Sequence, residues 1–161
     1  MEREAKIRRT GLRVLLGLLF LGVLLAVIWF VTLPAILPTW SNQPGSEQVV
    51  QAFRDKGLEV GRSYPVEQEP GWEDKPVPKT YQEATRFEIP SLGADAGGRV
   101  FVFRTERNLA AVRDYYSGLP GNIRPYVYVE DGVLLQLNNE LSESEAQKYR
   151  DVLRDAVKDT A

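Results

Sequence analysis

The pattern of apolar and polar positions divides the chain into two parts. The first is dominated by residues 14–37, an apolar run that contains no charged residue. A helix of this length would extend about 36 Å, which is enough to cross a hydrocarbon core of about 30 Å. Pro34 and Pro38 are expected to kink the helix and then to end it. The pattern therefore predicts one transmembrane helix over residues 14–37, followed by a polar linker over residues 38–45.

Residues 46–161 instead contain short segments in which apolar and polar residues repeat at helical or strand spacing, as in a folded domain. Val49 and Phe53 repeat at helical spacing behind Ser46, a suitable N-cap, and predict a helix over residues 47–56. The other predicted elements are helices over residues 106–118 and 142–159, strands over residues 58–64, 85–90, 99–105, 125–130 and 133–138, and a proline-rich loop over residues 65–79.

Three of these predictions depend on specific local signals. Residues 99–105 have apolar side chains on both faces, which is typical of a central strand that is covered on both sides. Asp131 and Gly132 separate two alternating strands, and this dipeptide favours a type I′ hairpin. Ser142 and Glu145 have the spacing of a capping box. The order of the elements predicts an α+β fold, with a single antiparallel sheet and helices packed mainly on one face.

Charge gives the predicted transmembrane helix a direction. Residues 1–13 carry five basic and two acidic side chains, a net charge of +3. The whole chain has a net charge of −2, so the remaining residues carry −5. Basic flanks stay on the cytoplasmic side of a membrane. We therefore expect residues 1–13 to be a cytoplasmic tail and residues 46–161 to be an extracytoplasmic domain at the cell membrane.

The chain contains neither cysteine nor histidine. Their absence excludes a lipid anchor on cysteine, metal sites built on thiolate or imidazole, and Ser-His-Asp or Cys-His catalysis. No cofactor is predicted, and an acidic domain without a basic run is a poor binder of nucleic acids. The expected partners are the lipid bilayer, through residues 14–37, and an envelope protein. The oligomeric state stays open.

The acidic residues of the proline-rich loop leave one catalytic alternative. They surround Trp72 and are Glu67, Glu69, Glu73 and Asp74. Paired carboxylates can act as general acid and base, so a hydrolase is an alternative function. Their spacing matches no EF-hand loop and Lys75 interrupts them, so we interpret the loop as solvated and predict no enzymatic activity.

An aromatic sheet face is the candidate binding site. Tyr126 and Tyr128 share one face of their predicted strand, and Phe101 and Phe103 share one face of theirs. The candidate binding face comprises Tyr126, Tyr128, Phe101, Phe103, Gln136 and Trp72. Such a face binds ligands well because each tyrosine ring offers contact area and a polar tip. The alternative is that these side chains form a second layer of core, which the proline-rich loop covers and into which Trp72 of that loop inserts.

Four pieces of the sequence carry a resemblance. They are the VFVF strand at residues 100–103, the helix ending in Tyr115-Tyr116, the hairpin YVYVEDGVLLQLN at residues 126–138 and the helix LSESEAQKYRDVL at residues 141–153. Over residues 100–153 the chain resembles small uncharacterised bacterial envelope proteins, some anchored by lipid and others by a helix. The resemblance implies an outward-facing anchored domain and no particular activity. The lack of cysteine separates this chain from the lipid-anchored members.

The sequence therefore predicts a single-pass membrane protein that presents an α+β domain outside the cytoplasm. The leading hypothesis for its function is a tethered binding or accessory module, since an anchor raises the effective concentration of the domain toward neighbouring proteins. The alternatives are a small-ligand receptor that uses the aromatic face and, less favoured, the carboxylate hydrolase.

Overall fold

The computed structural model describes residues 40–93 and 96–160. The predicted cytoplasmic tail over residues 1–13 and the predicted transmembrane helix over residues 14–37 lie outside the described residues. Within the described ranges, no helix combines the length and the apolar character that crossing a bilayer requires. The folded domain belongs to one compact unit, Pro38–Ala161.

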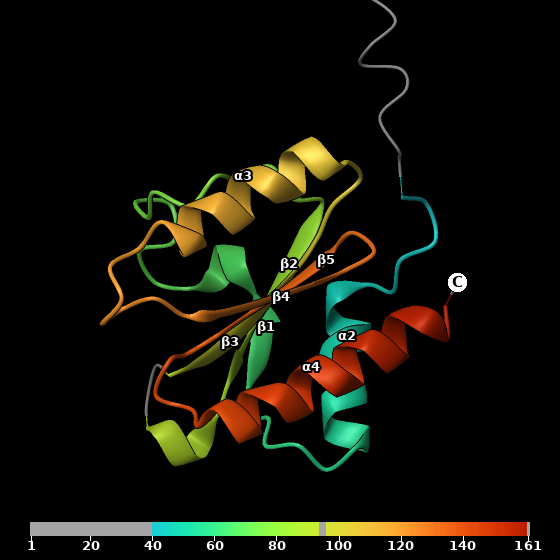
Figure 1. Ribbon diagram of the computed structural model, residues 1–161, viewed down its shortest axis with the longest axis vertical. Coiled ribbons are helices and arrows are strands. Elements are labelled where there is room, and N and C mark those ends of the chain that lie inside the picture. Colours follow the sequence, from blue (N-terminus) through green and yellow to red (C-terminus); the bar gives the residue numbers. More distant parts are fainter. Residues whose placement is uncertain (1–39, 94–95, 161) are drawn as a thin grey trace, which may run out of the picture. The chain divides into compact units, whose positions relative to one another are not determined.

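The described chain forms one five-stranded sheet and three α-helices (Figure 1). The helices are α2 (Ser46–Asp55), α3 (Glu106–Ser117) and α4 (Glu143–Lys158), with short 3-10 helices at Val66–Gln68 and Pro90–Leu92. The strands are β1 (Ser63–Pro65), β2 (Glu83–Glu88), β3 (Gly97–Val102), β4 (Tyr126–Glu130) and β5 (Val133–Leu137). The sheet order is β1-β2-β3-β5-β4 and every neighbouring pair is antiparallel. The predicted α+β fold with a single antiparallel sheet is confirmed.

Local sequence signals account for two of the element boundaries. At the start of α4, the Glu145 N–H donates to the Ser142 hydroxyl at 3.3 Å, and the Ser142 N–H donates to the Glu145 carboxylate at 3.0 Å. This is the predicted capping box. Between β4 and β5, φ is 34° at Asp131 and 86° at Gly132. Two consecutive positive φ angles are the mark of a type I′ turn, which confirms the predicted hairpin.

The sheet is covered on both faces because its central strand β3 is apolar on both. Val100 and Val102 pack into one core with α2 and α4. Phe101 and Phe103 pack into a second core with α3 and the proline-rich loop between β1 and β2. Figure 1 shows α3 on one side of the sheet and α2 and α4 on the other. Two of the three helices thus lie on one face, as predicted, and the prediction is extended by α3, which covers the other face.

Candidate functional site

The six residues of the predicted aromatic face do not lie together. Phe101 and Phe103 are fully buried on the α3 side of the sheet. Trp72, in the proline-rich loop, is 1% exposed, and its ring centre lies 6.2 Å from that of Phe101. These three side chains form the interior of a core, as in the alternative that the sequence left open, and offer no surface to a ligand.

The two tyrosines lie on the opposite face, against the core of α2 and α4. The rings of Tyr126 and Tyr128 stack with centres 6.4 Å apart, and the guanidinium of Arg150 lies 5.7 Å from the centre of Tyr128. Gln136 is buried on the α3 side, where its side-chain oxygen accepts a hydrogen bond of 2.7 Å from Arg99. This division follows from the strand register, since adjacent residues of a strand point to opposite faces.

A buried group of charged side chains lies beneath the proline-rich loop. The Glu69 carboxylate accepts hydrogen bonds from Nε (2.9 Å) and Nη2 (2.5 Å) of Arg99 and forms an ion pair with Lys75. Nε of Arg86 lies 3.9 Å from Glu69, and its Nη1 donates to two main-chain carbonyl oxygens at 2.6 and 3.2 Å. Because the Glu69 side chain is only 10% exposed, the interpretation of this loop as solvated is wrong for Glu69.

The charges of this ion cluster (Glu69, Lys75, Arg86 and Arg99) support one another. Burial raises the pKa of Glu69, but the hydrogen bonds and charges of Arg99 and Lys75 outweigh it and hold the pKa below its ordinary value of 4.5. Burial lowers the pKa of Arg99, but its bond to Glu69 prevails and raises that pKa. Glu69 is thus held ionised and fastens the loop to the sheet, which is the opposite of a general acid.

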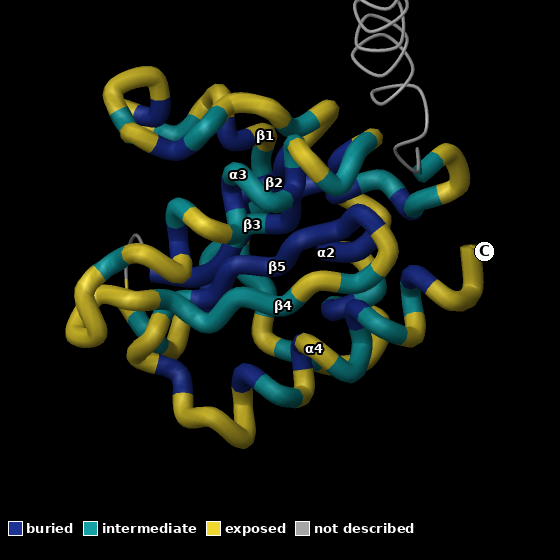
Figure 2. Tube along the Cα trace, turned by 45° about the horizontal axis from the view of Figure 1, so that its top comes forward, coloured by how far each residue is buried: buried dark blue, intermediate teal, exposed yellow. Residues whose placement is uncertain are grey.

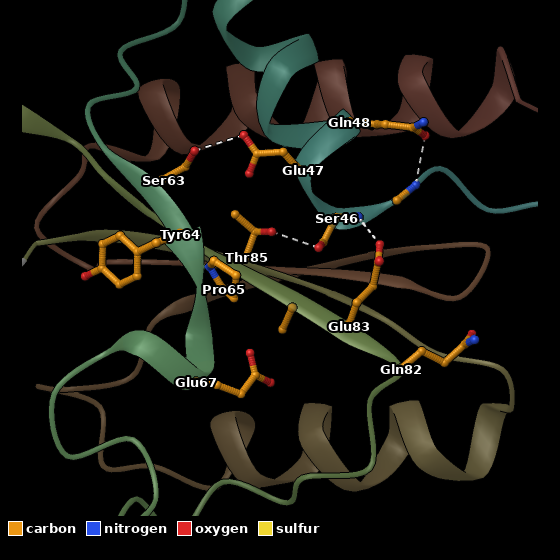
Figure 3. A pocket seen from close by; sticks show the side chains of 12 residues that line it. Ser46, Glu47, Gln48, Ser63, Tyr64, Pro65, Glu67, Gln82, Glu83 and Thr85 are labelled. Carbon is orange, nitrogen blue, oxygen red and sulfur yellow. Dashed lines mark hydrogen bonds between the residues drawn. The ribbon is translucent and has the colours of Figure 1, made fainter.

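A groove of about 800 Å³ opens where the first turn of α2 meets β1 and β2 (Figure 3). Three segments that are distant in the sequence line it, within residues 45–48, 63–67 and 82–85. Its charged lining residues are three glutamates, Glu47, Glu67 and Glu83. The described lining includes no lysine or arginine. We call this feature the acidic groove.

Polar contacts fix the inner side of the acidic groove. Gly45 is the N-cap of α2, and the Ser46 N–H donates to the Glu83 carboxylate. The Ser46 hydroxyl lies 2.8 Å from the Thr85 hydroxyl and joins α2 to β2. The observed N-cap is therefore Gly45, one residue before the predicted Ser46. The physical reason is that Glu83, from β2, supplies the acceptor that an N-cap side chain ordinarily provides.

The outer side of the groove holds a second set of contacts. The Ser63 hydroxyl donates to the Glu47 carboxylate at 2.9 Å, and Arg54 donates to both residues, at 2.8 Å to Ser63 and 3.2 Å to Glu47. Glu67 is exposed and points into the groove from the side of the proline-rich loop (Figure 3). Carboxylates and hydroxyls in this arrangement can bind a cationic group through charge-assisted hydrogen bonds. Among the described residues, no three metal-binding side chains come close enough to hold an ion.

The sequence did not reveal the acidic groove because its three segments meet only in the folded domain. A glutamate after a helix start, as at Glu47, reads as ordinary compensation of the helix dipole, and Glu83 precedes the predicted strand without any distinguishing signal. Comparison with known proteins adds no candidate function: no family model, no curated protein and no solved structure matches the chain.

Proposed function

We propose that this protein is a single-pass membrane-anchored binding module, whose domain outside the cytoplasm holds a cationic group of an envelope partner in the acidic groove. The observation that carries the proposal is the groove itself, which is lined by three glutamates and by no basic side chain among the described residues. A lysine ammonium or an arginine guanidinium of a partner has the complementary charge and the hydrogen-bond donors to pair with the exposed Glu67 and with the lone pairs that Glu47 and Glu83 keep beyond their internal contacts.

The predicted anchor supports the same function. A domain confined to the membrane surface meets neighbouring membrane and envelope proteins at a high effective concentration, so a modest affinity is enough for it to bind them. The charge of −5 outside residues 1–13 also favours the approach of a basic partner.

The groove is better suited to binding than to acid–base catalysis. A general acid or base needs a carboxylate within reach of a substrate and available to exchange a proton. Glu47 already accepts from Ser63 and Arg54, and Glu83 accepts from the first turn of α2. An aromatic receptor face has less support, because its six candidate residues are divided between the two faces of the sheet.

The anchor is tested by deleting residues 14–37. We expect the full chain to stay in the membrane pellet after an alkaline carbonate wash, because a helix of this hydrophobicity inserts stably. The deletion variant should appear in the soluble fraction instead. Protease added to intact spheroplasts should digest the domain of the full chain and leave residues 1–13 protected. Release of the full chain by the wash would contradict the anchor.

The groove is tested by the substitution Glu67→Lys. We expect the affinity for a tetralysine peptide to fall about tenfold, because a surface charge pair is worth about 1 kcal/mol and the reversal turns attraction into repulsion. Calorimetric titration of the full chain in maltoside micelles measures this change. Glu73→Lys is the matched control, since it makes the same change of charge at an exposed residue outside the groove lining. Equal losses in both variants would contradict a specific site.

A further inference from the structure

β4 is an edge strand whose outer side faces no other strand in the described part of the chain. It is the last strand of the sheet order and pairs only with β5. The type I′ hairpin closes at the pair Glu130–Val133, and hydrogen-bonded pairs recur at every second residue. The N–H and C=O groups of Val127 and Val129 therefore point away from β5, toward the open side.

The two edges of the sheet differ in their protection. β1, at the other edge, has three residues and ends in Pro65, and short edge strands with proline resist further pairing. β4 has five residues and contains neither lysine nor proline. The described chain has two exposed large hydrophobic side chains, and both belong to this region: Ile123, 55% exposed, and Val129, 37% exposed. Figure 2 shows β4 at the margin of the sheet, only partly buried.

The charges that flank β4 are complementary to those of a second, antiparallel copy of the same strand. Arg124 and Glu130 lie three residues on either side of Val127, so a second strand of the same sequence, running antiparallel with Val127 opposite Val127, places each Arg124 opposite a Glu130. By strand alternation these charges lie on the same face as Tyr126 and Tyr128. Shifting the register by one step, to Tyr128 opposite Tyr128, puts Arg124 opposite Gly132 and loses both charge pairs.

We propose that β4 binds a second copy of this chain by antiparallel strand addition centred on Val127, which joins the two sheets into one. The two Val127 residues exchange a reciprocal pair of backbone hydrogen bonds, and each Val129 N–H donates to the Pro125 carbonyl of the other copy. Arg124 donates from Nε to the Leu119 carbonyl at 3.0 Å, and its terminal nitrogens are the donors that would pair with Glu130 of the other copy. Opposite charges directly across two strands stabilise their pairing.

The proposal is independent of the acidic groove, which lies at the β1 and β2 side of the sheet. A two-stranded contact of this length is small, and this step rests on the proposed anchor, because confinement of both copies to one membrane would raise their effective concentration enough to favour it. The contact is isologous, so it closes after two copies and forms no filament.

Cysteine cross-linking tests the proposed register directly, because the natural chain has no cysteine. Hydrogen-bonded antiparallel pairs have Cα atoms about 5.5 Å apart, within the range that a disulfide spans. We expect Val127→Cys in the full chain, reconstituted in neutral lipid vesicles and treated with copper phenanthroline, to form a covalent dimer at least tenfold faster than Gln51→Cys on α2. Tyr128→Cys should react more slowly than Val127→Cys, because the register places it opposite Tyr126.

Charge exchange adds a test of the partner's identity. In the Val127→Cys background, Arg124→Glu and Glu130→Arg should each slow cross-linking about fivefold, and the double variant should recover to within twofold. A measurement that needs no added cysteine is native mass spectrometry of the full chain released from lipid vesicles. Val129→Pro should convert dimer to monomer there, since an edge strand tolerates proline where its N–H faces outward. Equal rates for Val127→Cys and Gln51→Cys, no recovery in the double variant, or an unchanged dimer with Val129→Pro would each overturn the proposal.

Discussion

Replacing Trp72 with alanine is expected to lower the free energy of unfolding by about 4 kcal/mol, because truncating a fully buried large aromatic side chain removes its transfer energy and leaves a cavity. Trp72 is 1% exposed although it lies in a loop that has no regular strand or α-helix. Its indole N–H donates to the Tyr81 hydroxyl at 2.9 Å, and its ring packs against Phe101.

Basic side chains extend the packing of Trp72. The guanidinium of Arg99 lies 5.5 Å from the centre of the indole ring, and the ammonium groups of Lys75 and Lys79 lie 5.7 Å from it. Cation–π contacts of this kind add to the burial of the ring. The alanine substitution therefore loosens the loop as well as the second core, and the affected region includes the ion cluster beside it.

Thermal unfolding followed by near-ultraviolet circular dichroism measures the effect of Trp72→Ala. Trp72→Phe is the matched control: it keeps most of the buried area and loses the hydrogen bond to Tyr81, so it should cost about 1 to 1.5 kcal/mol. A loss below about 1 kcal/mol for alanine would mean that the loop is not part of the folded core in solution.

The elements that could be predicted from the sequence are those whose signals are local. The Asp131-Gly132 turn, the Ser142 capping box and the two apolar faces of β3 each depend on residues within a few positions of one another. Such signals act before tertiary contacts form, and they determine the α+β class. The distribution of the helices between the two faces could not be predicted in this way, because it depends on the side of the sheet to which the chain returns after each strand. Both α3 and the proline-rich loop return to the face of Phe101.

The buried ion cluster and the acidic groove could not be predicted from local patterns, because their residues come from distant parts of the sequence. Arg86 alternates with Phe87 along its strand, and a charged residue in such a pattern is usually exposed, yet Arg86 is 3% exposed. Its counter-charge, Glu69, comes from a loop whose position no period predicts. The acidic groove has the same origin, since Glu47, Glu67 and Glu83 meet only after β1 pairs with β2.

Glu69→Gln is expected to lower the free energy of unfolding by about 3 kcal/mol at neutral pH, because it removes the carboxylate charge that compensates the largely buried guanidinium of Arg99. The glutamine amide keeps one acceptor oxygen, so Arg99 loses one of its two hydrogen bonds and the negative charge that both share. Arg86 loses the carboxylate charge that lies 3.9 Å from its Nε. Denaturation by urea measures the difference. Glu88→Gln is the matched control, because Glu88 pairs with Arg62, whose side chain is 80% exposed, and water replaces that contact. Its loss should be much smaller.

The pH dependence of the free energy of unfolding, compared between wild type and Glu69→Gln, separates the effect of charge from that of packing. The pKa of Glu69 in the folded protein lies below its ordinary 4.5, so the unfolded chain binds the proton first as the pH falls. The stabilisation is therefore complete above about pH 4.5 and is lost as the pH falls through the lower, folded pKa. The pKa values of Glu88 and Glu145 are also lowered, by Arg62 and by Ser142, but both groups are present in wild type and variant and cancel in the difference. The gap between wild type and Glu69→Gln should thus narrow below about pH 4.5, whereas a gap that stays constant would assign the loss to packing.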